Sequence, residues 1–134
     1  MINKMITLIC LTSFIISCSL DRNNPVDPIN TGTPAPSLVT GLFVQPVNDY
    51  WLSISWDSDP DNVDGYYLYR SMSYDGYYEL LNVIDHDVSS YDDTDEIDTT
   101  NNIYWYKISA FVEIGDDNIR LEGVRSNPQS WGPY

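Results

Sequence analysis

Four aspartates stand within eight residues of this chain, in the stretch "SWDSDPDNVDGYYLYRS" that begins at Ser55. They are Asp57, Asp59, Asp61 and Asp64, so the first three alternate along the chain and the fourth follows three positions later. Calcium takes about six to eight oxygen ligands, and alternate residues of a looping chain can supply several of them. One interpretation of this stretch is therefore a calcium site.

The same aspartates are also typical of a turn. Calcium loops of the EF-hand kind place Gly at the sixth position and a bidentate acid at the twelfth, but Asn62 and Leu68 stand there in this chain. The sequence Asp59-Pro60-Asp61 is turn chemistry, because Asp side chains cap loop amides and Pro fixes the backbone. We interpret the stretch as a connection between strands, with calcium as the alternative. A second acidic run, Asp92 to Asp98, is weaker still as a cation site.

The sequence offers few residues that could carry out catalysis. His86 is the only histidine and stands between two aspartates in "DHD", a context typical of a solvated loop. No serine lies in a nucleophile-elbow motif, no Gly-rich phosphate loop is present, and zinc would lack thiol and imidazole ligands. Asp and Glu residues that could form the carboxylate pair of a glycoside hydrolase are numerous, but their number alone does not indicate such a pair. We therefore expect that the protein is not an enzyme.

The chain is strongly acidic, with 20 Asp and Glu residues, six Lys and Arg residues and a formal net charge of −14. Nucleic acids are bound by clustered cations that neutralise phosphates, so this balance predicts no nucleic-acid partner. At 134 residues the chain has room for one ordinary domain with appendages.

The N-terminal residues 1–17 have the features of an export signal. Lys4 supplies positive charge, and the apolar run from Met5 to Ile16 follows it. This run is well short of the roughly 20 residues that a membrane-spanning helix needs, which favours a cleaved signal peptide over a permanent anchor.

The stretch "IISC", which ends at Cys18, resembles a bacterial lipobox. The resemblance implies cleavage before Cys18 and a diacylglycerol on its sulfur, and Ser17 suits the small position before the cysteine. Cys10 is a rival, but the bulky Ile9 precedes it and it lies inside the apolar run. Two or three acyl chains make a stable anchor. We therefore expect a lipoprotein that is bound to the membrane of the cell envelope.

Residues 18–36 are predicted to form a disordered, Pro-rich linker. The stretch "SLDRNNPVDPINTGTPAP" has too little apolar content to bury a core. Its prolines favour an extended tether of about 3.1 Å per residue. Ser19, directly after the lipidated cysteine, resembles the outer-membrane sorting signal of two-membrane bacteria, which indicates the outer membrane or the cell surface.

From Ser37 onward the apolar residues recur with period two, which is typical of strands. The clearest runs are "YWLSISW", "GYYLYRS" and "IYWYKISAF". Weaker strands are indicated at 38–44, 77–84, around Tyr91 and at 119–125, and no stretch supports a helix. About seven short antiparallel strands across residues 37–134 predict an all-β sandwich.

The order and spacing of these motifs resemble the fibronectin type III family over residues 37–128. Trp56 ends the second strand, as the core tryptophan of the family does. "VDGYYLYRS", from Val63, is similar to the following junction and strand, and the stretch from Ser90 to Phe111 is similar to a later strand, connection and strand. "GVRSNP" resembles the final strand. The resemblance implies an immunoglobulin-like sandwich of two sheets with Greek-key connections.

Tyr104 matches the tyrosine corner of the family, and its hydroxyl should reach a backbone group near Thr99 or Thr100. The side chains expected between the sheets are Leu52, Ile54, Trp56, Tyr66, Leu68, Tyr104 and Ile108.

The same alternation places aromatic residues on the outer face of one sheet. They are Tyr67, Tyr69, Trp105 and Phe111, with Lys107 among them. An exposed aromatic patch can mark a partner, whether a protein or a sugar. The alternative is cross-strand pairing that stabilises the sheet, and the sequence leaves both open.

These features predict a membrane-anchored, non-catalytic envelope module that presents a fibronectin type III domain for protein or polysaccharide binding. The alternative is a structural spacer subunit of an envelope assembly, and a hydrolase is the least favoured function.

Overall fold

The computed structural model describes residues 33–115 and 119–133, so the predicted signal peptide, Cys18 and most of the linker lie outside the described residues. Within these ranges the chain forms eight strands, and none of its elements is a helix that could cross a membrane. The strands are β1 Phe43–Asn48, β2 Trp51–Ser55, β3 Gly65–Ser71, β4 Glu79–Asp85, β5 Ser90–Asp93, β6 Tyr104–Ile114, β7 Ile119–Glu122 and β8 Gln129–Trp131.

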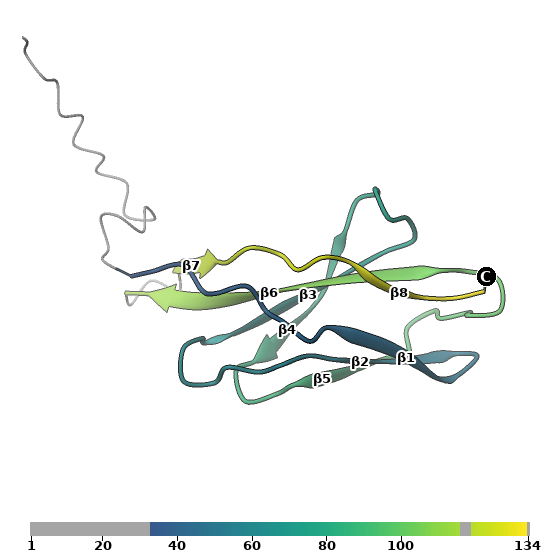
Figure 1. The fold of residues 1–134 in the computed structure, drawn as a ribbon, viewed down its shortest axis with the longest axis horizontal. Coiled ribbons are helices and arrows are strands. Elements are labelled where there is room, and N and C mark those ends of the chain that lie inside the picture. Colours follow the sequence, from purple (N-terminus) through teal and green to yellow (C-terminus); the bar gives the residue numbers. More distant parts are fainter. Residues whose placement is uncertain (1–32, 116–118, 134) are drawn as a thin grey trace, which may run out of the picture.

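The strands form two antiparallel sheets, which confirms the predicted all-β fold (Figure 1). One sheet has the order β1-β2-β5 and the other the order β4-β3-β6-β7, with β8 also paired to β6. The segment between β7 and β8 is also hydrogen-bonded to β6. The N–H groups of Gly123 and Ser126 donate to the carbonyls of Ala110 and Ile108, respectively. Two short strands and this segment thus share one partner strand.

Several strand limits differ from the prediction, most of all at the first and last strands. β1 begins at Phe43 rather than at Leu38 and continues through Pro46 to Asn48. Pro46 is tolerated because β1 lies at the edge of its sheet, where an amide donor is not required. The stretch "GVRSNP" is not the final strand, since β8 begins only after it, at Gln129.

The seven side chains expected between the sheets all belong to one buried apolar cluster. Trp56 and Tyr66 meet edge to face, with ring centroids 5.6 Å apart. The Tyr66 hydroxyl also accepts a hydrogen bond of 2.8 Å from the backbone N–H of Asp59. This bond ties the aspartate-rich connection to the core.

Tyr104 closes the connection between β5 and β6 through upstream backbone groups that lie just before the expected Thr99. Its hydroxyl accepts a hydrogen bond from the Asp98 N–H at 2.9 Å and donates to the Glu96 carbonyl at 3.2 Å. Thr99 itself donates through its N–H and Oγ1 to the Asp49 carbonyl. Glu96 has a φ of 55°, a left-handed conformation that is unfavourable for a residue other than glycine. The corner therefore holds a strained turn.

Tyr104→Phe is expected to lower the free energy of unfolding by about 1 to 2 kcal/mol, because the turn loses one donor and one acceptor while the ring remains. Urea unfolding followed by tryptophan fluorescence measures this loss. Tyr50→Phe is the matched control, since Tyr50 is exposed and its hydroxyl makes no hydrogen bond among the described residues. An unchanged unfolding midpoint for Tyr104→Phe would show that the corner does not stabilise the fold.

Candidate functional site

The predicted aromatic face is largely covered, which corrects the expectation that it lies open. Tyr69 is only 6% exposed and Phe111 only 2%, while Tyr67 and Trp105 are half-buried. The Arg125 guanidinium lies 3.8 Å from the centroid of the Tyr69 ring, and that of Arg120 lies 4.4 Å from the Phe111 centroid. Long cationic side chains from β7 and the segment after it therefore close much of this face.

The remaining members of the predicted face also have partners in the fold. The Tyr67 and Phe111 rings pack with centroids 4.7 Å apart, and Trp105 packs edge to face on Tyr74 at 5.1 Å. The Lys107 ammonium lies 4.3 Å from the centroid of the Tyr78 ring. These contacts favour the cross-strand interpretation of the face, in which the aromatic residues stabilise the sheet.

The Glu122 carboxylate joins Tyr69 of this face to two other groups. Glu122 Oε1 accepts hydrogen bonds from the Tyr69 hydroxyl at 2.8 Å, from Ser109 Oγ at 2.6 Å and from Arg125 Nε at 3.1 Å. Burial opposes ionisation of Glu122, but these hydrogen bonds outweigh it and lower its pKa. Burial, and then the bond to the charged Glu122, raises the pKa of Tyr69 to about 12.

Tyr69→Phe is expected to reduce the loss of stability in alkali. The pKa of Tyr69 is higher in the folded state than the ordinary 10.0, so its contribution is complete below pH 10 and is lost as the pH rises to about 12. The free energy of unfolding, measured at several values across this range, should therefore fall less steeply in Tyr69→Phe than in the wild type. Burial also raises the pKa of Tyr106, so part of the fall should remain. Equal slopes in the two proteins would contradict the assignment.

The four clustered aspartates do not converge on one point. The Asp57 carboxylate accepts a hydrogen bond from Thr40 Oγ1, and that of Asp59 accepts one from Asn62 Nδ2. Asp64 Oδ2 accepts a bond from the backbone N–H of Glu113, and Asp61 is exposed. Across residues 33–115 and 119–133, no group of three or more potential ligands could hold a metal ion. The geometry supports the interpretation of this stretch as a connection.

The second acidic run and the histidine are likewise separate from one another. Asp93 is fully buried beside Arg70, and Asp98 binds the side chains of Thr100 and Asn101. His86 is exposed directly after β4. Asp93 and Asp98 do not share a site with the aspartates that precede β3. His86 lines a hollow together with Asp61 and Asp64.

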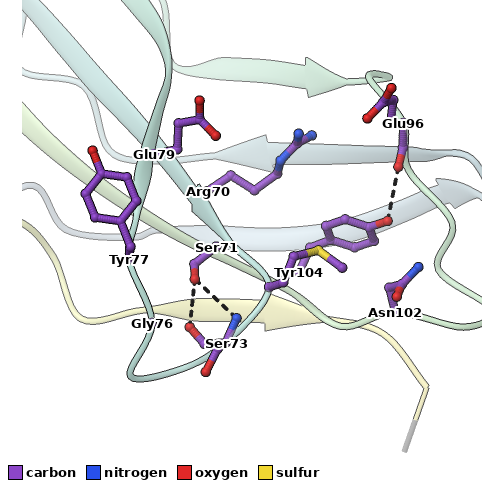
Figure 2. A pocket seen from close by; sticks show the side chains of 10 residues that line it. Arg70, Ser71, Ser73, Gly76, Tyr77, Glu79, Glu96, Asn102 and Tyr104 are labelled. Carbon is purple, nitrogen blue, oxygen red and sulfur yellow. Dashed lines mark hydrogen bonds between the residues drawn. The ribbon is translucent and has the colours of Figure 1, made fainter.

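A groove of about 520 Å³ opens between the β3–β4 hairpin and the connection from β5 to β6 (Figure 2). The residues that define its chemistry are Arg70, Tyr77, Glu79, Glu96, Asn102 and Tyr104. A second hollow of about 320 Å³ shares Arg70, Glu79 and Glu96 with it. Two segments that are distant in sequence thus line one groove.

Arg70 lies at the centre of the groove and is held by a buried carboxylate. Its Nη1 donates to both oxygens of Asp93, at 3.0 and 3.1 Å, and to the Asp95 carbonyl at 2.8 Å. Burial disfavours the charge of Arg70, but Asp93 outweighs this effect and raises its pKa. The Tyr106 hydroxyl donates to Asp93 Oδ2 at 2.7 Å. Nε and Nη2 of Arg70 make no hydrogen bond within the described residues, so they remain available to a ligand.

The hairpin beside the groove exposes several large apolar side chains. They are Met72, Tyr74, Tyr77, Leu80 and Val83. The loop between β3 and β4 projects beyond the two sheets (Figure 1). The sequence predicted the two strands of this hairpin but not its role as a candidate site. The stretch "MSYDGYY" gives a signal, because its aromatic residues fall in a turn where the alternation of a strand does not require them.

No protein-family profile and no curated protein matches this sequence. The fold is similar to a solved Fn3-like protein from Clostridium thermocellum, with a TM-score of 0.59 and 21% identity over 75% of this chain and 97% of that one. It is also similar to the fn3 domain of human contactin 1, with a TM-score of 0.57 and 16% identity over 72% and 77% of the two chains. A third similar structure, an FN3 domain of human collagen XX, has a TM-score of 0.50 and 17% identity over 72% and 96%. These likenesses show a fibronectin type III-like fold.

Proposed function

We propose that this fibronectin type III-like domain is a non-catalytic binding module of the bacterial cell envelope, attached to the membrane by a lipid on Cys18. Its partner, a protein or a polysaccharide, binds at the β3–β4 hairpin and the groove beside it. One observation carries the proposal: among the described residues, five of the twelve large exposed hydrophobic side chains belong to this single hairpin. Exposed apolar side chains that gather on one element often mark a contact site, and Tyr, Met and Arg are enriched in such sites.

The side chains of the groove support a non-catalytic role. A hydroxyl nucleophile needs an adjacent base. Ser71 Oγ is instead bonded to the backbone of Ser73, at 2.9 Å to its carbonyl and 3.2 Å from its N–H (Figure 2). His86 lines a different hollow, beside Asp61 and Asp64. Nη1 of Arg70 and the Tyr104 hydroxyl already make hydrogen bonds within the fold.

A spacer role is the second candidate, and the path of the chain favours it. The described chain enters at one end of the sandwich and leaves near the other (Figure 1). The two ends of the described chain are therefore separated by the length of the sandwich. A spacer would retain no other envelope component.

The lipid anchor is tested by Cys18→Ala. In the bacterium, the wild-type chain is expected in the membrane fraction and to incorporate an alkyne-labelled fatty acid, whereas Cys18→Ala should incorporate none. Cys10→Ala is the matched control and should behave as the wild type. A wild-type chain without label would overturn the proposed anchor.

The binding role is tested with two leucine variants of similar exposure. Leu80 on the hairpin is 46% exposed, and Leu38, which precedes β1, is 51% exposed. The immobilised wild type and Leu38→Ser are expected to retain the same envelope component, and Leu80→Ser is expected to retain at least about threefold less of it. Retention of nothing by the wild type would favour the spacer.

A further inference from the structure

The groove beside the β3–β4 hairpin contains an aromatic ring that the fold does not use. Tyr77 is 87% exposed and has no ring contact or hydrogen bond with another described residue. Its neighbours differ, because Tyr74 packs on Trp105 and Tyr78 donates its hydroxyl to the Tyr74 carbonyl. A large apolar ring at a groove wall, left without a partner, is suited to stack on a ligand.

Unused hydrogen-bonding groups surround the same groove. Nε and Nη2 of Arg70 are free donors, and the carboxylates of Glu79 and Glu96 accept no hydrogen bond from the described residues. Figure 2 shows Arg70 between Tyr77 and Glu79 on one side and Glu96 on the other. The bond from the Tyr104 hydroxyl holds the backbone at Glu96 in place. Donors and acceptors are therefore set around the groove before any ligand arrives.

We infer that this groove binds an uncharged oligosaccharide, an inference that rests on the proposed binding function and names its ligand. A sugar offers a C–H face, which stacks on an aromatic ring, and hydroxyl groups that both donate and accept hydrogen bonds. The Tyr77 ring can stack on the C–H face of the sugar. The Arg70 N–H groups and the carboxylates of Glu79 and Glu96 can form hydrogen bonds with its hydroxyl groups. The volume of about 520 Å³ lies within the range of small-ligand sites.

The charges around the groove select against acidic ligands. The single guanidinium is already paired with the buried Asp93, so the free carboxylates of Glu79 and Glu96 leave the groove negative. Uronic acids and phosphates would be repelled by this field. Uncharged hydroxyl groups bind carboxylates without such a penalty.

The test uses the full chain, an array of uncharged oligosaccharides (glucan, mannan, xylan and chitin fragments) and a polygalacturonate fragment of equal length. Calorimetry then measures the affinity for the best uncharged fragment. Tyr77→Ala is expected to bind it at least about tenfold more weakly than the wild type. Tyr50→Ala, an exposed tyrosine that lines neither cavity, should bind as the wild type does. Thermal unfolding should be unchanged in both variants, because both side chains are exposed.

The outcomes separate this inference from the proposed function. Failure of every uncharged fragment to bind, equal affinity in Tyr77→Ala, or a preference for polygalacturonate would overturn the inference. An envelope protein that is lost with Leu80→Ser but kept with Tyr77→Ala would also overturn it, while the binding module would stand. If the wild type retains neither a sugar nor a protein, the proposed function fails as well.

Discussion

Asp93→Ala is expected to lower the free energy of unfolding by about 3 to 5 kcal/mol, the range for breaking one side of a buried ion pair. Asp93 is fully buried and accepts hydrogen bonds from Arg70 and Tyr106. Its removal leaves the buried Tyr106 hydroxyl without its acceptor and leaves the Arg70 guanidinium with only the Asp95 carbonyl. The cost is the desolvation of these two groups as well as the lost attraction.

Equilibrium urea unfolding at neutral pH measures this effect. The matched control is Asp92→Ala, because Asp92 is the neighbouring residue of β5 but is exposed, and its removal should change stability by less than about 0.5 kcal/mol. The double variant Arg70→Met with Asp93→Ala should regain part of the loss, since no unpaired guanidinium remains. A single variant that unfolds at the wild-type midpoint would show that the pair contributes nothing.

Gly65→Ala is the second large effect, with an expected loss of about 3 kcal/mol from overpacking. A Cβ at residue 65 would lie 2.6 Å from the Ile84 carbonyl oxygen and 2.6 Å from Cζ of Phe111. The backbone of β4 cannot retreat without losing its pairing with β3, and the Phe111 ring lies under Arg120. A single methyl group therefore disturbs two neighbouring strands.

The double variant Gly65→Ala with Phe111→Leu separates the two contacts. The smaller side chain removes the clash with the ring but leaves the clash with the Ile84 carbonyl, so only part of the stability should return. Thermal unfolding of the single and double variants measures this difference. If Gly65→Ala unfolds with the wild type, the close packing of Phe111 on β3 would be disproved.

The proposed ligand site includes Arg70, a residue that also stabilises the fold. Arg70 offers Nε and Nη2 to the groove while its Nη1 holds Asp93, so a substitution at Arg70 would change stability and binding together. Tyr77 has no such double role, because it is exposed and makes no internal bond. This is why the binding experiment relies on Tyr77.

The sequence by itself determined the fold class and the side chains of the core. The alternation in β2, β3 and β6 placed Leu52, Tyr66 and Ile108 on inward faces, and they are buried in the structure. Such an inference succeeds because the period of two is a local property of an extended backbone, in which successive side chains point to opposite faces. The inference does not require knowing which segment packs against each face of the sheet.

Only the tertiary structure decided the state of the outer face and the position of the groove. Tyr69 and Phe111 point outward as the period requires, yet Arg125 and Arg120 cover them from β7 and the segment that follows it, which pair with β6. The ion pair of Arg70 and Asp93 joins residues 23 positions apart on different sheets. The period of two in the sequence assigns each side chain to a face of its sheet. Which segment covers that face depends on how parts of the chain that are distant in sequence pack together. The same packing brings the β3–β4 hairpin and the β5–β6 connection together around the groove.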